Sequence, residues 1–203
     1  MKRLFTFLLL IPIISISQVQ KNDSIFSKIY LLDEVSVTGS RASKDIPMTF
    51  SDVDSEELSK RNLGQDLPIL LKYFPSVVSY SDAGAGIGYT GIRVRGSDAT
   101  RVNVTINGIP YNDAESQGTF WVNLPDFTSS IKNIQLQRGV GTSVNGSSAF
   151  GASLNIQTDG LYSERFSEIS QSFGSFNSRK RTVKYTTGLI NNRFEFSGRH
   201  STI

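Results

Sequence analysis

From residue 77 onward, the chain contains several segments in which apolar and polar residues alternate with a period of two. This period is typical of β-strands, in which successive side chains point to opposite faces. Val102, Val104 and Ile106 alternate in this way up to Asn107-Gly108, a dipeptide that favours a tight hairpin turn. The same pattern predicts further strands at Val77–Tyr80, Ile92–Gly96, Ile131–Leu136 and Leu154–Ile156. A strand-rich fold is therefore expected.

Three further alternating segments close the chain. They are Glu164–Phe173, Ser178–Leu189 and Asn192–Thr202. Each has about the ten residues that a tilted membrane β-strand needs. Apolar Val183 and Tyr185 oppose polar Thr182, Lys184 and Thr186, as on a strand with an apolar outer and a polar inner face. A half-exposed hairpin of a soluble protein gives the same pattern, so periodicity alone leaves both interpretations open.

Two short helices are expected before the predicted strand at Val77–Tyr80. Asp54 can cap the first, with Glu57 completing a capping box, and Gly64 suits the left-handed position after its end. Asp66 can cap the second, and Pro75 stops it. The second helix has one apolar face, made of Leu67, Leu70, Leu71 and Phe74.

The first residues have the features of an export signal. Lys2 and Arg3 precede an apolar run, Leu4–Ile14, and Ser15 and Ser17 are the small residues that a signal peptidase reads, so cleavage is predicted after Ser17. The chain without this segment is close to neutral and gives no charge argument for nucleic acid.

The residue composition limits which catalytic and metal sites the chain can form. The chain has no cysteine, which excludes disulfides, thiolate zinc sites and cysteine nucleophiles. Its single histidine, His200, argues against a histidine metal cluster or a Ser/His triad. We therefore expect no catalytic residues, no cofactor and no metal site.

The glycine-rich stretch 137–158 invites comparison with a phosphate-binding loop, because Gly141–Ser148 reads G-x-x-x-x-G-S-S. Ser147 stands where the phosphate-binding lysine is required, and Ala149–Thr158 reads as a strand where a helix is required. A nucleotide-binding enzyme is therefore the least favoured alternative. The glycines are expected to serve tight turns and close backbone packing.

Four segments resemble, in order, motifs of a known family. They are Asp33–Thr38, "LPILLKYFPSV" from residue 67, "IRVRGSDATRVNVTINGIPYND" from residue 92 and "IKNIQLQRGVGTSVNGSSAFGASLNIQT" from residue 131. Following an export signal, they make the chain similar to the N-terminal part of a TonB-dependent outer-membrane receptor. The departures from the family pattern are conservative for turns and packing: Ser76, Asn107, Val140 and Asn145.

The resemblance implies an α+β plug domain, with a small mixed sheet and short helices, followed by the first antiparallel strands of a truncated transmembrane β-barrel. It implies a signal peptide at 1–17, a flexible N-terminus at 18–43, a plug at 44–160 and barrel strands at 161–203. Plugged transporters have about 22 strands. The chain is therefore interpreted as a fragment that by itself would neither insert nor transport.

The resemblance also assigns roles to residues. It implies a TonB box, which would add as a strand to TonB, at Asp33, Glu34, Val35, Ser36, Val37 and Thr38. Arg95 and Arg138 match the plug arginines that face acidic residues of the barrel wall. The alternatives are an ordinary plug edge strand for the box and solvated surface charges for the arginines.

Ligand contacts are expected from two loops of mixed aromatic and polar character. The predicted contact residues are Tyr80, Asp82, Tyr89, Asn112, Asp113, Glu115, Gln117, Phe120 and Trp121. Each of them also fits a loop-packing role.

The function implied is import of a scarce solute, with an iron chelate as first candidate and cobalamin, other metal complexes or glycans after it. The expected partners are TonB, the solute and outer-membrane lipid, without nucleic acid. The expected location is the bacterial outer membrane, with the TonB box facing the periplasm. The main alternative is a soluble exported β-rich binding module, which predicts that the chain ends naturally at Ile203.

Overall fold

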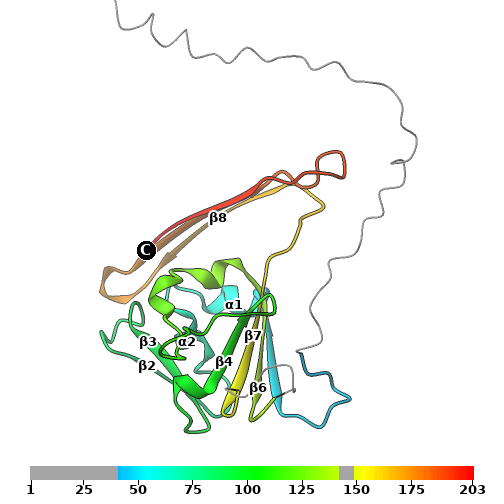
Figure 1. Ribbon diagram of the computed structural model, residues 1–203. Coiled ribbons are helices and arrows are strands. Elements are labelled where there is room, and N and C mark those ends of the chain that lie inside the picture. The colour runs from blue at the N-terminus through cyan, green and yellow to red at the C-terminus, as the bar shows by residue number, and fades with distance from the viewer. Residues whose placement is uncertain (1–40, 142–148) are drawn as a thin grey trace, which may run out of the picture. The chain divides into compact units, whose positions relative to one another are not determined.

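The computed structural model describes residues 41–141 and 149–203 (Figure 1). The strands are β1 (Phe50–Asp54), β2 (Val77–Ser81), β3 (Thr90–Val94), β4 (Val102–Ile106), β5 (Ile109–Pro110), β6 (Ile131–Arg138), β7 (Ala152–Thr158), β8 (Phe166–Phe173), β9 (Arg179–Thr186) and β10 (Ser197–Thr202). The helices are α1 (Ser55–Arg61) and α2 (Leu67–Leu71), with 3-10 turns η3 (Ala99–Arg101), η4 (Trp121–Asn123), η5 (Phe127–Ser130) and η7 (Ser175–Asn177). Within these ranges no helix is both long and apolar enough to cross a membrane.

The central sheet has five strands in the order β1-β6-β7-β4-β5. β7 pairs antiparallel with β6 and parallel with β4, so the sheet is mixed, as expected. Asn107 and Gly108 both have positive φ in the turn between β4 and β5, which confirms the predicted hairpin. β1 was not foreseen, because its sequence, FSDVD, carries little strand signal; it is an edge strand on β6.

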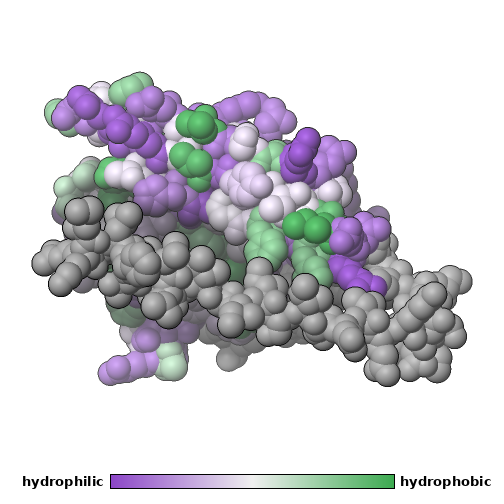
Figure 2. Space-filling view, turned by 90° about the horizontal axis from the view of Figure 1, so that it is seen from above, coloured by the Kyte–Doolittle hydropathy of each residue, from purple (hydrophilic) through white to green (hydrophobic). Residues whose placement is uncertain are grey.

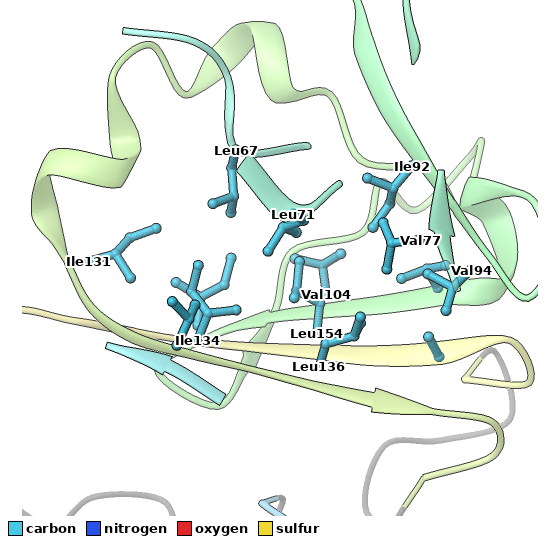
Figure 3. Close-up of a cluster of buried hydrophobic side chains, with 14 of the residues drawn as sticks. Leu67, Leu71, Val77, Ile92, Val94, Val104, Ile131, Ile134, Leu136 and Leu154 are labelled. Carbon is cyan, nitrogen blue, oxygen red and sulfur yellow. The ribbon is translucent and has the colours of Figure 1, made fainter. Parts of the chain in front are cut away.

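The apolar core lies on one face of this sheet. Figure 3 shows Ile134, Leu136 and Leu154 of the sheet pointing toward Leu67 and Leu71 of α2. The β2–β3 hairpin closes the same core from beside α2 (Figure 3). Full burial of each such side chain contributes about 1.5–3 kcal/mol, so this cluster fixes the hairpin and α2 against the sheet.

The opposite face of the central strands is polar but also buried. Thr105 Oγ1 donates to Asn155 Oδ1 (2.8 Å), and Gln137 Nε2 donates to Gln135 Oε1 (2.9 Å). Gln135 also exchanges hydrogen bonds with the backbone of Ala42. Since buried polar groups need partners, this amide layer explains how strands with alternating sequence are buried on both faces.

The helices follow their predicted caps with one difference. Asp54 Oδ1 accepts from the Glu57 amide (2.9 Å), which confirms the cap of α1. Asp66 occupies the N-cap position of α2 without capping it, because its carboxylate accepts from Thr90 Oγ1 (2.9 Å). Burial raises the pKa of Asp66, and the Thr90 hydrogen bond opposes that rise. Asp66 therefore ties α2 to β3.

Two strand boundaries differ from expectation. β3 ends at Val94, because Val94 and Ser97 exchange backbone hydrogen bonds (3.2 and 2.9 Å) around Arg95 and Gly96, both with positive φ. Arg95 thus lies in a turn and not on the face of β3. The last tail strand begins at Ser197, and the preceding connection is longer than predicted.

The cause of that second difference is a turn at Asn191 and Asn192, which have φ of +52° and +54°. It is closed by the backbone hydrogen bond from Ile190 N to Phe194 O (2.7 Å). Asparagine adopts left-handed conformations readily. The Asn191-Asn192 pair therefore forms a turn within a segment that the alternation of apolar and polar residues had predicted to be strand.

The wall strands, β8 to β10, form an antiparallel sheet in the order β10-β9-β8. Along β9, Lys180, Thr182 and Thr186 are buried, whereas Val183 and Tyr185 are exposed. This confirms the predicted opposition of a polar inner and an apolar outer face. Figure 2, seen from above the view of Figure 1, shows hydrophobic side chains interspersed among hydrophilic ones.

The glycines around β6 and β7 serve the backbone, as predicted. Gly139 and Gly141 have positive φ, and Gly146 lies outside the described residues. A Cβ on Gly151 would stand 2.6 Å from Ser97 Cβ and 3.0 Å from the Arg101 carbonyl oxygen. The Gly151 amide donates to that same carbonyl (2.8 Å), so the two chain segments touch at a point that leaves no room for a side chain.

We predict that Gly151→Ala lowers the free energy of unfolding by roughly 1–3 kcal/mol, because the new methyl forces the Ser97 turn away. Gly198→Ala is the matched control, since a Cβ there meets nothing within 4 Å, and its effect is expected within about 0.5 kcal/mol. Urea titration of both variants measures the difference. Equal stabilities would show that the close contact at Gly151 has no energetic weight.

Candidate functional site

The first candidate site begins at the tip of the β2–β3 hairpin. The Asp82 amide donates to the Tyr89 carbonyl (3.0 Å), and Tyr80 pairs with Gly91 in the strand register. Strand alternation therefore places Tyr80, Asp82 and Tyr89 on one face of the hairpin. This face points away from the core, and the two tyrosines are 46% and 67% exposed.

Gly91 positions the ring of Tyr80. A Cβ at Gly91 would lie 2.4 Å from Tyr80 Oη and 2.5 Å from Cζ. The tyrosine ring therefore lies across the strand where Gly91 has no side chain, an arrangement in which an aromatic ring covers a strand glycine.

The second loop, residues 112–120, is shaped by its own polar side chains. Asn112 Nδ2 donates to the carbonyls of Val102 (2.9 Å) and Gln117 (2.8 Å), and its Oδ1 accepts from the Val104 amide (2.7 Å). Asp113 accepts from the amide and hydroxyl of Ser116 (2.7 and 2.8 Å). The Ser116 hydrogen bonds lower the pKa of Asp113. Asn112 therefore holds the loop against β4, and Asp113 fixes its internal turn.

The two loops enclose a cavity of about 270 Å³, which we call the aromatic cavity. It is lined by Tyr80, Asp82, Gly88, Tyr89, Thr90, Ala99, Thr100, Ser116, Gly118, Thr119, Phe120, Trp121 and Val122. Trp121, only 3% exposed, belongs to the core and forms the floor. The Thr119 hydroxyl is buried and has no hydrogen-bond partner within the described ranges.

The aromatic cavity brings together part of the predicted contact set. It unites Tyr80, Asp82, Tyr89, Phe120 and Trp121 from both loops. The other predicted residues, Asn112, Asp113, Glu115 and Gln117, do not line it. Sequence reasoning overlooked Ser116 and Thr119, although both lie in the predicted loop.

Arg95 and Arg138, the two arginines predicted to face acidic residues of the barrel wall, are neighbours. A Cβ on Gly139 would lie 3.4 Å from Arg95 Nη1, and Arg138 donates to Ser51 Oγ (2.7 Å) and to the Phe50 carbonyl (3.3 Å). Burial lowers the pKa of Arg138, and the charge of Arg95 lowers it further. Within residues 41–141 and 149–203 neither guanidinium pairs with a carboxylate.

A buried carboxylate, Asp126, joins the wall strands to the rest of the fold. It accepts from Lys180 Nζ of β9 (2.6 Å), Arg199 Nη1 of β10 (2.7 Å) and Ser129 Oγ (2.8 Å). Asn62 Nδ2, at the end of α1, lies 3.4 Å away. Asp126 is 3% exposed, and the Lys180 side chain is 5% exposed. We call these five residues the Asp126 cluster.

A second ion pair repeats this polarity. Lys184 Nζ of β9 donates to Asp159 Oδ2 (2.5 Å) and to Tyr162 Oη (2.8 Å). In both contacts the wall strand supplies the cation and an earlier segment supplies the anion, the reverse of the charge arrangement that the resemblance implied for Arg95 and Arg138. A polar cavity of about 600 Å³ lies beside these contacts, with Ser55, Thr128, Ser170 and Thr182 among its lining residues.

Within the described part of the chain, His, Asp and Glu side chains form no group of three or more that could hold a metal ion.

A family model for the TonB-dependent receptor plug domain matches residues 42–153, which is more than half of the chain. The chain belongs to this family. No curated protein sequence matches it.

Solved structures show the same fold at low identity. The ferric yersiniabactin uptake receptor FyuA from Yersinia pestis has a TM-score of 0.60 and 17% identity, over 80% of this chain and 25% of FyuA. The siderophore receptor PirA from Acinetobacter baumannii has a TM-score of 0.55 and 20% identity, over 85% and 26%. The copper transporter OprC has a TM-score of 0.53 and 17% identity, over 75% and 23%. The chain spans about a quarter of the length of these proteins.

The plug fold and the wall strands together match the expected fold class of a plug followed by the start of a receptor barrel. The predicted TonB box at 33–38 lies outside the described residues. The Asp126 cluster was not foreseen, although the alternating Thr182, Lys184 and Thr186 in the sequence did indicate a polar inner face on β9. Its anion could not be assigned, because Asp126 and Lys180 are 54 positions apart.

We predict that Asp126→Asn destabilises the plug against the wall strands by about 3–5 kcal/mol at neutral pH, because buried Lys180 loses its counter-charge. The isosteric amide preserves shape. Asp45→Asn is the control, since Asp45 is exposed. Urea titration of each variant gives the free energies of unfolding, and equal values for the two variants would contradict this role of Asp126.

The pH dependence follows from the pKa of Asp126. Burial alone would raise this pKa, but hydrogen bonds from Lys180, Ser201 and Ser129 and the charge of Lys180 outweigh burial and lower it below 3.8. The ion pair therefore contributes fully above the unfolded-state value of about 4 and is lost as pH falls through the lowered value. The stability gap between the native chain and Asp126→Asn is expected to close in acid.

Proposed function

We propose that this chain is the plug and first wall strands of a TonB-dependent outer-membrane receptor that imports a scarce solute, with a ferric chelate as the leading candidate. The observation that carries this proposal is the plug-family match over residues 42–153. FyuA and PirA, which share the fold, are receptors for ferric yersiniabactin and for a siderophore. No bond of the solute is broken in this function; the plug binds it and then moves.

The solute site is placed at the aromatic cavity. Its lining combines apolar rings with a few polar groups, as small-molecule sites do. The five predicted residues that line it are the proposed contacts. Asn112 and Asp113 act indirectly by holding the loop, and Glu115 and Gln117 lie on the same loop within reach of a larger solute.

The plug is proposed to be held by two kinds of charged contact. The Asp126 cluster supplies one. For the other, the paired guanidiniums of Arg95 and Arg138 suit a bidentate carboxylate, which residues beyond the described ranges would provide. Two neighbouring cations without a counter-ion repel each other, so acidic wall residues would be drawn to this point.

The wall strands are proposed to face outer-membrane lipid. Ile169 and Phe173 of β8 are 81% and 68% exposed, and Val183 and Tyr185 of β9 are exposed on the same face. An apolar outer face opposite a polar inner one is the arrangement of membrane barrels. A soluble binding module would leave these side chains in water.

Energy is proposed to reach the plug through TonB, which would pair with an extended segment at Asp33–Thr38 facing the periplasm. Main-chain hydrogen bonds give such strand addition its grip. The segment continues toward Arg41 and Ala42, whose hydrogen bonds to Asn133 and Gln135 attach the chain to β6. Tension on the box would therefore reach the central sheet.

Val35→Pro in the full-length protein tests this function. Proline removes one amide donor and restricts the segment, whereas Val35→Ala keeps the donor and is the control. We predict that Val35→Pro lowers uptake of a labelled ferric chelate by about tenfold or more, while chelate binding to the cells is unchanged. Uptake that survives the proline would rule out this segment as the TonB contact.

A further inference from the structure

The aromatic cavity has an unusual distribution of charge. Four aromatic residues line it, and three of them, Tyr80, Tyr89 and Phe120, are each 46% or more exposed. Asp82 is the one charged residue in the lining, and no lysine or arginine belongs to it. The Asp82 carboxylate has no hydrogen-bond or ion-pair partner within the described ranges. An aromatic face attracts a cation through its quadrupole, and an unpaired carboxylate adds to that attraction.

The residues next to the lining strengthen this field. Asp98 precedes Ala99 and Thr100, and Asp113 holds Ser116. Hydrogen bonds with Thr100 lower the pKa of Asp98, and those with Ser116 lower the pKa of Asp113, so both are anionic at neutral pH. Glu115 is a further exposed carboxylate on the same loop.

Two basic side chains lie in the same region, and both are outside the lining. Arg93 pairs with Val78, four residue pairs along the β2–β3 hairpin from Asp82–Tyr89 and two from Tyr80–Gly91. Arg101 follows Thr100, and its charge acts on Asp98. The charges of both arginines act on Asp98, whereas the lining itself carries one carboxylate, that of Asp82, and no cation.

We infer that the aromatic cavity recognises a positively charged group, such as an alkylammonium, on the imported solute. The exposed rings of Tyr80, Tyr89 and Phe120 surround the cation, and Asp82 neutralises it. This inference rests on the proposed function and names the class of solute: neutral or cationic chelates carrying an amine, and not polyanionic ones such as ferric tris-catecholates.

The test compares two probes that differ by one charge. A ferric linear tris-hydroxamate with a free terminal amine and its N-acetylated form are titrated against outer-membrane vesicles containing the full-length protein. The amine form is expected to bind about tenfold more tightly. Asp82→Asn should abolish this preference, whereas Asp45→Asn, which removes an exposed charge that does not line the cavity, should retain it.

A second pair of probes does not depend on a chelate. Choline and its neutral isostere 3,3-dimethylbutanol are compared for their ability to slow nitration of Tyr89, measured by mass spectrometry of the same vesicles. Choline is expected to protect several times better, and Asp82→Asn to remove the difference. Equal protection, or none from either probe, would overturn the inference.

The two arms separate this inference from the proposed function. Tight chelate binding without preference for the amine form would sink the cation inference and leave the chelate receptor standing. Protection of Tyr89 by choline without binding of either chelate would support the cation site and count against chelate import.

Discussion

β7 lies between β6 and β4, and the rest of the structure depends on its two sets of backbone hydrogen bonds. One set is antiparallel and the other parallel, so β7 fixes segments that are far apart in the sequence. Both of its faces are buried, one against the apolar core and one against the amide layer. The aromatic cavity is built on that core through Trp121, and Arg138 extends from the partner strand β6. A displacement of β7 would therefore disturb both.

Through the Asp126 cluster, the polar face of the wall strands contacts the plug. Strand alternation places Lys180 and Arg199 on the face of the wall strands that is directed toward the plug. A cation that is desolvated there requires a counter-charge. Asp126 meets that need with a carboxylate that bonds to both cations and to Ser129. Removing one partner of such a contact is costly, because the other charge is then buried without compensation. Its charge pattern is the reverse of the one proposed for Arg95 and Arg138.

Local sequence signals predicted much of the fold. Alternation located β4, β6 and β7, the Asn107-Gly108 dipeptide located a hairpin, and Asp54 located a helix start. Two of the misses share a physical cause, which is that tertiary contacts overrode the local pattern, whereas the boundaries of β3 and β10 were shifted by local turns at Arg95-Gly96 and Asn191-Asn192. β1 forms because β6 offers an open edge, and Asp66 forgoes its cap because Thr90 lies opposite. The candidate site was predicted in part. The sequence indicated the aromatic residues of two loops, but their arrangement around one cavity depends on how the β2–β3 hairpin packs.

Trp121 is the only tryptophan of the 203 residues, and it lies where the core meets the aromatic cavity. It lines the aromatic cavity and belongs to the apolar core. The emission of this chromophore depends on the polarity around it. A single natural fluorophore of this fold is therefore sensitive both to the cavity and to the packing of the core.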